Sequence, residues 1–139
     1  MLSPKTSVSL DEVKPAVEEP EEVVDRLIAV LARGDNATVP HLLCREACFL
    51  TQDATAIHGR ARVVSLIAQL IAAEVDVRPL AQHSLQIASF ALISARWRLS
   101  FRAREEPLVQ TTEATLVLAL REGNWKFLLV APWGCPRSR

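Results

Sequence analysis

Residues 91–101 read ALISARWRLSF, and this stretch decides the fold class. Apolar side chains occupy its odd-numbered positions, including Ile93, Trp97 and Phe101, and serine or arginine occupies most of the positions between them. Successive side chains of a β-strand point to opposite faces of the sheet, so a period of two predicts a strand with one buried face. The stretch therefore predicts a sheet that packs a core on one side and meets solvent on the other.

The same alternation extends through the second half of the chain. We expect strands at 78–90, 91–103, 108–120 and 125–131, with hairpin turns at 105–107 and 122–124. On strand 108–120, Gln110 and Thr112 share the apolar face, whereas Glu113 points the other way. Glu113 is expected to form a cross-strand ion pair with the neighbouring arginines Arg96 and Arg98.

The first half of the chain shows helical spacing instead. A helix is expected to begin near Glu18, with Pro20 in its first turn, and to end at Gly34. A short helix at 36–43, two short strands at 47–51 and 55–57, and a third helix after Gly59 follow. About three N-terminal helices and then antiparallel strands predict an α+β domain, with the helices on one face of a curved, mainly antiparallel sheet.

Length and composition are those of one folded domain. The chain has 139 residues, of which 50% are hydrophobic and 23% are charged. We divide it into a mobile acidic leader at 1–17, a domain at 18–134 and a short tail at 135–139. Apolar runs fall short of the roughly 20 residues that span a bilayer, and no secretory signal is present. Three cysteines without an export signal favour reduced thiols and a cytoplasmic location, with no membrane partner.

Charge is unevenly distributed along the chain, although the formal net charge is zero. Residues 1–25 hold two basic and seven acidic side chains, a net charge of −5, so the remainder carries +5. Arg96, Arg98 and Arg102 lie on the polar face of the strand quoted above, where they suit an acidic partner, a dimer interface or a solvated face. A pI near 6.8 and the lack of aromatic residues on that face argue against nucleic acid as a partner.

Several loose motifs occur in an order that points to a family. These are VLARGD at 30–35, IHGR at 57–60, ALISARW at 91–97, GNWKF at 123–127 and PWG at 132–134. Over about residues 18–134 the sequence resembles the nuclear-transport-factor-2-like superfamily, in its SnoaL-like and ketosteroid-isomerase-like branch. The resemblance implies a cone-shaped fold, an apolar pocket opening at one end and a homodimer formed through the sheet. Relatives include isomerases, polyketide cyclases, epoxide hydrolases, dehydratases and non-catalytic binding modules, so the fold leaves function open.

The sequence departs from the catalytic members of this branch. Ketosteroid isomerases use a tyrosine in the oxyanion hole, and this chain contains no tyrosine. Many SnoaL-like relatives carry His-Asp-His before the terminal Pro-Trp, where this chain has Leu129, Val130 and Ala131. Hydrocarbon therefore occupies positions at which an acid or base is expected, and proton-transfer chemistry is disfavoured.

Four residues are candidates for a ligand pocket. If Trp97 faces inward, its neighbours on the same face include Gln110 or Thr112, with Trp125 and Trp133 on the same face of the last strand. A mostly apolar cavity with a few polar groups is the usual composition of a small-molecule site. The alternative is that these tryptophans fill the core and that the polar groups meet backbone partners.

His58 is the candidate acid or base, because it precedes the glycine that opens the third helix. His41, Cys44 and Cys48, with His58 as a fourth ligand, have zinc-like spacing but lack the paired clusters of a structural zinc site. The four glycines lie far apart, so no phosphate loop is present. We therefore predict no cofactor and no metal.

Three functions remain open at this stage. The first is a small-molecule-binding SnoaL-like domain that takes a mostly apolar ligand, works as a homodimer and has no proven catalysis. The second is an isomerase, cyclase or hydrolase acting on a polyketide-like or terpenoid-like substrate by acid–base chemistry. The third is a non-catalytic protein-interaction module that dimerises.

Overall fold

A computed structural model describes residues 18–103, 105–106 and 108–135. The predicted leader, parts of the 105–107 turn and most of the predicted tail lie outside these residues. The elements follow in the order α1 (Pro20–Arg33), 3-10 helix η1 (Val39–Leu42), β2 (Leu43–Leu50), β3 (Ala56–His58), α2 (Arg60–Ala72), β4 (Val75–Ile87), β5 (Phe90–Phe101), β6 (Leu108–Arg121) and β7 (Asn124–Ala131). No helix in this described part is long and apolar enough to cross a membrane.

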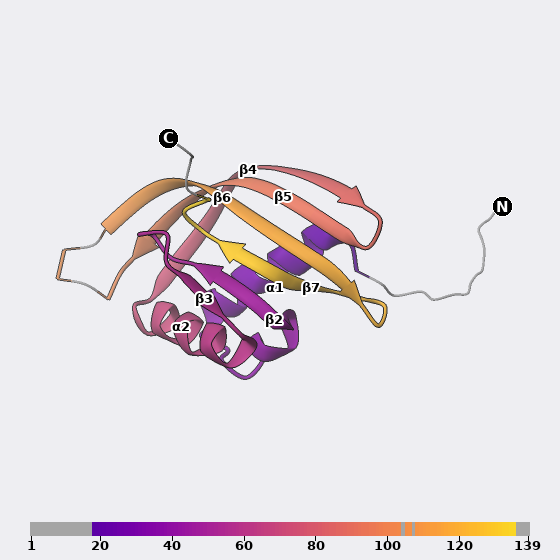
Figure 1. The fold of residues 1–139 in the computed structure, drawn as a ribbon. Coiled ribbons are helices and arrows are strands. Elements are labelled where there is room, and N and C mark those ends of the chain that lie inside the picture. The colour runs from indigo at the N-terminus through magenta and orange to yellow at the C-terminus, as the bar shows by residue number, and fades with distance from the viewer. Residues whose placement is uncertain (1–17, 104, 107, 136–139) are drawn as a thin grey trace.

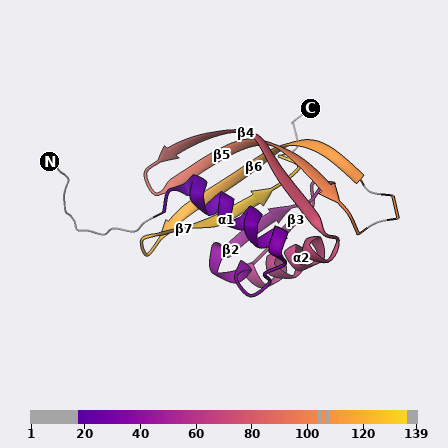
Figure 2. The same cartoon turned by 180° about the vertical axis from the view of Figure 1, so that it is seen from behind.

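The six strands form one mixed sheet in the order β3-β2-β7-β6-β5-β4. Every pairing is antiparallel except that of β2 with β7. The sheet bends strongly, and Figure 1 shows α1 crossing its hollow side while α2 lies beside β2 and β3. The view from behind shows α1 running along the inner face of the long strands (Figure 2). The α+β class and the curved, mainly antiparallel sheet wrapped around N-terminal helices are confirmed.

Helix α1 begins and ends where its sequence dictates. Pro20 takes the first helical position, where its missing N–H costs nothing, and Glu19 and Glu22 form a reciprocal capping box. The backbone N–H of Glu19 donates to the Glu22 carboxylate over 2.7 Å. Gly34 ends the helix in the left-handed conformation at φ 69°, a conformation that glycine adopts without strain. These signals fix the length of the helix that fills the hollow of the sheet.

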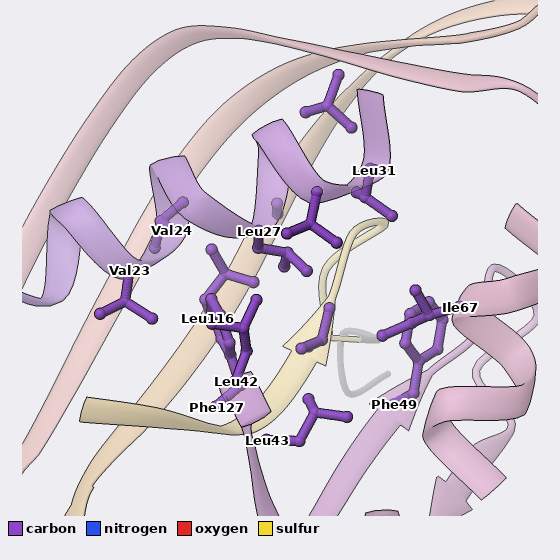
Figure 3. Packing of buried hydrophobic residues seen from close by; sticks show 14 of the residues in the cluster. Val23, Val24, Leu27, Leu31, Leu42, Leu43, Phe49, Ile67, Leu116 and Phe127 are labelled. Atoms are coloured by element: carbon purple, nitrogen blue, oxygen red, sulfur yellow. The ribbon is translucent and has the colours of Figure 1, made fainter. Parts of the chain in front are cut away.

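The core lies between this helix and the inner face of the sheet. Val23, Val24 and Leu27 of α1 point toward Leu116 of β6 and Phe127 of β7 in the close view of Figure 3. All five side chains are at most 2% exposed. Burial of a large apolar side chain stabilises the fold by about 1.5–3 kcal/mol, so this layer fixes α1 against the sheet.

Helix α2 covers the other end of the inner face. Ile67 of α2 lies against Phe49 of β2, as the same view shows, and Val63 is fully buried beside them. On this helix Val63 and Ile67 are buried, and Leu66, Leu70 and Ile71 are half-buried. The two helices therefore cover different parts of one sheet.

The structure corrects the bounds of two expected elements and the expected number of helices. The short helix expected at 36–43 is a single 3-10 turn at Val39–Leu42, because Leu43 already pairs with Phe127 as the first residue of β2. Two α-helices and one 3-10 helix therefore replace the three helices expected. The strand expected at 78–90 is β4 at Val75–Ile87, because Val75 and Val77 are buried opposite Phe101 and Leu99. Alternation begins at Val75, directly after α2.

The outer face of the sheet has an apolar end and a charged end. Leu85, Leu92 and Val117 lie side by side on β4, β5 and β6, and Ile87 pairs with Phe90 in the next row. The exposed fractions of Leu85 and Ile87 are 54% and 62%. Packing of the core does not account for apolar residues at these positions, because their side chains point away from the core.

Candidate functional site

Trp97 and Thr112 face each other on neighbouring strands of the inner face. The register pairs Trp97 of β5 with Thr112 of β6 and Leu99 with Gln110. Trp97 is 1% exposed and Thr112 is 8% exposed, while the residues on either side of them are exposed or paired on the outer face. The expected inward orientation of Trp97, with Thr112 and Gln110 beside it, is confirmed.

An apolar cavity adjoins Trp97 between the two helices and the sheet. Its volume is about 20 Å³, enough for about one water molecule. Every described residue that lines it is apolar; the lining comprises Leu27, Leu31, Phe49, Ile67, Leu70, Val75, Val77, Trp97, Leu99, Phe101, Val130, Pro132 and Trp133. The cavity is small, because side chains of α1 and α2 fill most of the cone.

A larger, open groove lies on the other side of Trp133. It has a volume of about 750 Å³ and is lined by Gln52, Gln110, Thr111, Thr112, Glu113, Thr115, Trp133, Gly134 and Cys135. Among the described residues, Trp133 alone lines both the cavity and the groove. Its indole N–H donates to Oε1 of Gln110 over 2.9 Å. This hydrogen bond holds the indole as a wall between the two spaces.

Tight packing behind Trp133 fixes the position of that wall. The chain turns after β7, and the backbone N–H of Gly134 donates to the carbonyl of Ala131 over 2.9 Å. Gly134 has φ 81°, and a Cβ atom there would lie 2.5 Å from the carbonyl oxygen of Glu113. Only glycine allows the backbone to approach β6 so closely in this conformation.

Two buried side-chain atoms beside the wall have no hydrogen-bond partner within the part of the chain that the structure describes. They are Nε1 of Trp97 and Oγ1 of Thr112, the two residues that face each other across β5 and β6. A buried donor or acceptor left unsatisfied costs about 1–3 kcal/mol, so native chains seldom retain one without a reason. The pair is therefore the feature of the inner face that core packing does not explain.

The family follows from a comparison with known domains. The family model of the SnoaL-like domain matches residues 21–129, which is most of the chain. The chain belongs to this family. No curated protein matches the sequence, so the family places the fold but assigns no reaction.

Solved structures with the same fold carry several different names. A candidate dehydratase of the NTF2-like family from Streptomyces avermitilis superposes with a TM-score of 0.72 at 15% identity, over 80% of this chain and 89% of that one. A candidate calcium/calmodulin-dependent protein kinase II association domain from Xanthomonas campestris gives 0.72 at 16%, over 91% and 95%. A candidate scytalone dehydratase from Novosphingobium aromaticivorans gives 0.70 at 9%, over 80% and 78%. At these identities the likeness shows the fold alone.

The SnoaL-like domain places the remaining candidate residues away from this site. His58 is exposed at the end of the edge strand β3, opposite Cys48, and lines neither the cavity nor the groove. Trp125 is buried in the core on β7, opposite Leu120, and does not line the cavity. The structure thus brings together Trp97, Gln110, Thr112 and Trp133 and leaves His58 outside.

Cys44 is buried in the SnoaL-like domain, and Arg96 and Glu113 form an ion pair on its surface. Cys44 is buried, and desolvation raises the pKa of its thiol, so it stays protonated. In the described ranges, no three His, Cys, Asp or Glu side chains gather as metal ligands. Arg96 Nε donates to Oε2 of Glu113 over 2.8 Å on the outer face, which confirms the expected ion pair.

Sequence reasoning missed the residues that close the cavity from the helix side. Leu27 and Leu31 of α1 and Leu70 of α2 line it, yet their helical spacing indicates only a buried stripe. Gln52, from the loop between β2 and β3, lines the groove, and nothing in the sequence links it to Gln110. The one available signal is the spacing of four between Leu27 and Leu31, which places both on one face.

Proposed function

We propose that this SnoaL-like domain binds a small, mostly apolar molecule in the groove and in the cavity behind Trp133, and that it does so without catalysis. The observation that carries the proposal is the position of Trp133, whose indole separates the groove from the apolar cavity. The groove volume of about 750 Å³ falls within the range of about 300–1,000 Å³ that is usual for ligand sites. Free cysteines support a cytoplasmic location for this function.

Binding is favoured over turnover by the composition of the lining. Every described residue around the cavity is apolar, and general acid–base catalysis needs a titratable group within hydrogen-bond reach of the substrate. Glu113 reaches the groove but is mostly exposed and bonded to Arg96. His58 stands outside both spaces. The acid–base alternative therefore receives no support from the geometry.

Ligand entry requires the Trp133 indole to move, because about 20 Å³ accommodates no organic ligand. A ligand that replaces the Trp133–Gln110 hydrogen bond joins the groove to the cavity and gains the apolar walls behind it. Since Trp133 is half-buried and follows the last strand, its displacement leaves the sheet itself intact. The cost of opening is then confined to one side chain and its short turn.

The three tryptophans provide an internal test of this site. A library of neutral aromatic and aliphatic compounds is screened by thermal denaturation, and a ligand at 100 times its Kd is expected to stabilise the fold by about 2.7 kcal/mol. Indole N–H resonances, assigned with Trp-to-Phe variants, then locate the binder. We expect the Trp97 and Trp133 signals to shift and the Trp125 signal to stay, because Trp125 does not line the cavity. The proposal is contradicted if no compound in the library stabilises the fold, or if only the Trp125 resonance shifts.

A second function, self-association through the outer face of the sheet, rests on a separate observation. Leu85, Ile87, Phe90 and Leu92 are between 42% and 62% exposed and adjoin one another on β4 and β5. Contiguous exposed apolar side chains mark interaction surfaces, and we propose a second copy of this chain as the occupant. Similar folds are named association domains, and charges of both signs lie at the other end of this face.

Sedimentation of paired variants tests self-association. Leu92→Glu places a charge at the centre of the exposed apolar rows and is expected to convert a dimer into a monomer. Ser65→Glu is the matched control, because Ser65 is exposed on α2, on the helix side of the sheet. A monomeric wild-type protein at tens of micromolar, or a Leu92→Glu protein that remains a dimer, contradicts this function.

A further inference from the structure

Strand β4 forms one edge of the sheet, and its two halves differ in how that edge is protected (Figure 1). Exposed edges invite pairing with other chains, and proteins protect them with charged residues, prolines and bulges. The first half holds Arg78 and Pro79, and the register with β5 shifts between Pro79 and Ala81. Residues 81–87 read AQHSLQI, contain no Asp, Glu, Lys or Arg, and pair with β5 without a break. The second half of β4 therefore lacks all three protections.

The main chain of residues 81–87 can accept a further strand. An edge strand directs alternate N–H and C=O groups away from its sheet. Among the described residues, the main chain of this segment hydrogen-bonds only to β5. The opposite edge strand, β3, has only three residues and offers a much shorter ladder. Extended peptides bind to edge strands through such ladders, so residues 81–87 are suited to bind one.

On the outer face, two apolar rows end at this edge. Leu85 and Ile87 of β4 are 54% and 62% exposed, whereas their partners on β5, Leu92 and Phe90, are 42% and 46% exposed. Exposure is greater on β4 because no further strand follows it in the described sheet. An added strand lies about 4.8 Å from its neighbour, so apolar side chains on its outer face can extend both rows.

On the inner face, helix α1 places acidic side chains beside the same edge. The Ser84 hydroxyl of β4 donates to the Glu21 carboxylate, which puts this side of α1 next to β4. Asp25 lies four residues after Glu21 and shares its side of the helix. Asp25 is exposed and forms no ion pair with a described residue. Residues 18–26 hold five acidic side chains and one basic one, a net charge of −4.

This charge selects the chemistry of the partner. A second copy paired edge to edge brings its own α1 toward the first, and the acidic side chains of the two helices repel each other. A basic side chain on the inner face of an added strand meets Glu21 and Asp25 instead, and opposite charges attract. Since side chains of a strand alternate between faces, the fitting segment alternates basic and apolar residues.

We propose that the edge of β4 at residues 81–87 binds an extended segment of a partner protein in which basic and apolar residues alternate. The segment adds a strand to the six-stranded sheet, with apolar side chains beside Leu85 and Ile87 and basic side chains beside Glu21 and Asp25. Residues 81–87 line neither the cavity nor the groove, so this interaction does not depend on ligand binding. It needs no self-association either, although Leu85 and Ile87 belong to both surfaces.

Three synthetic peptides test strand addition to the full chain. The first has ten residues, with lysine and valine alternating. The second has the same residues in two blocks, and the third keeps the alternating order but has every backbone N–H methylated. Calorimetric titration up to about 1 mM is expected to show binding of the first peptide and about 10-fold weaker binding of the others, because they lack the separated faces or the N–H donors. Equal binding of all three peptides, or no binding of the first, overturns the proposal.

Hydrogen exchange followed by mass spectrometry locates the bound peptide. With the alternating peptide present, amide exchange is expected to slow over residues 80–88 and to stay unchanged in β3, because the new ladder protects the outward N–H groups of β4. Slower exchange in β3 alone overturns the assignment to β4. Slower exchange at 80–88 that depends on protein concentration without any peptide shows that a second copy occupies the edge, and this also overturns the proposal.

Two charge reversals test the role of α1. Asp25→Lys leaves the Ser84–Glu21 hydrogen bond in place and is expected to weaken binding of the alternating peptide about 3–10-fold. The matched control is Glu106→Lys, the same charge change at an exposed residue between β5 and β6, at the opposite end of β5 from Phe90. It is expected to leave the affinity unchanged. No loss in Asp25→Lys, or an equal loss in both variants, means that α1 does not select the partner and overturns the proposal.

Discussion

The two ends of the sheet's inner face differ, although β5 and β6 run through both. At one end Leu116 and Phe127 are fully buried below α1, among apolar side chains (Figure 3). At the other end Trp97 and Thr112 leave polar atoms without partners beside a cavity and a groove. One end is packed with apolar side chains alone, and the other retains two buried polar atoms without partners among the described residues. Local departures from good packing are thus the most informative part of this domain.

Two Phe→Ala substitutions, one at each end, test whether the two ends are packed with different tightness. Phe127→Ala at the closed end is expected to cost about 3–5 kcal/mol of unfolding free energy, because a fully buried ring leaves a cavity. Phe101→Ala at the open end is expected to cost less, since Phe101 is 8% exposed and already borders a cavity. Urea denaturation at constant m-value gives both numbers. Equal losses, or a larger loss for Phe101→Ala, mean that the two ends are packed alike.

A pair of glycines tests the wall at the open end. Gly134→Ala introduces a Cβ atom 2.5 Å from the Glu113 carbonyl oxygen at φ 81°, so a loss of about 2–3 kcal/mol is expected from strain and clash together. Gly123→Ala has the same positive φ, 83°, but its Cβ meets no atom within 4 Å, so about 1–2 kcal/mol is expected.

The readout specific to the wall is tryptophan fluorescence. Gly134→Ala is expected to shift the emission to longer wavelength, because the displaced Trp133 indole loses its bond to Gln110 and enters water. Gly123→Ala is expected to leave the emission unchanged, since its turn lies at the other end of β7. Unchanged emission in Gly134→Ala shows that the wall does not depend on the close approach at Gly134.

The smallest expected effect comes from an ion pair outside both ends. Arg121 donates to the Glu46 carboxylate over 2.7 Å, and this hydrogen bond lowers the pKa of Glu46 from 4.5. A lowered folded-state pKa contributes stability above the unfolded-state value, and this is lost as the pH falls through the folded value. Glu46→Gln is expected to flatten the acid dependence of stability below pH 4.5 slightly, because both groups are exposed.

Arg121→Met is the companion variant for that ion pair. It removes the other partner and is expected to reproduce the flattened acid dependence of Glu46→Gln. Thermal denaturation between pH 3 and pH 7 follows both variants. A full acid dependence in either variant shows that the pair adds nothing to stability, as is found for many surface pairs.

Much of the fold was predictable because alternation is a local property. The period of two in 91–101 fixed the inward orientation of Trp97, and the matching pattern in 108–120 placed Thr112 on the same face. The turn at 36–43 was not predictable, because Leu43 leaves the helix to pair with Phe127, a residue distant in sequence. Local patterns carry face and element type, whereas element ends depend on partners elsewhere in the chain.

The site was predictable only as a set of residues. Trp97, Gln110, Thr112 and Trp133 were expected to line one pocket, whereas Trp97 lines the cavity, Gln110 and Thr112 line the groove, and Trp133 lines both. The volume of about 20 Å³ was not expected, because it depends on how Leu27, Leu31 and their neighbours fill the cone. The lack of hydrogen-bond partners for Trp97 Nε1 and Thr112 Oγ1 was also not predictable, since hydrogen bonding depends on distances that a sequence pattern does not contain.

The place of β7 in the sheet has a consequence for how the chain folds. This strand, residues 124–131, lies between β2 and β6 and, in the described sheet, joins the β2–β3 hairpin to the β4–β6 meander. During synthesis the two parts are made first, and each exposes an unpaired strand edge, which is prone to aggregate. The sheet closes only when residues 124–131 become available, and this pairing of distant segments is intrinsically slow. The sheet of this domain is therefore completed only after residues 124–131 have been made.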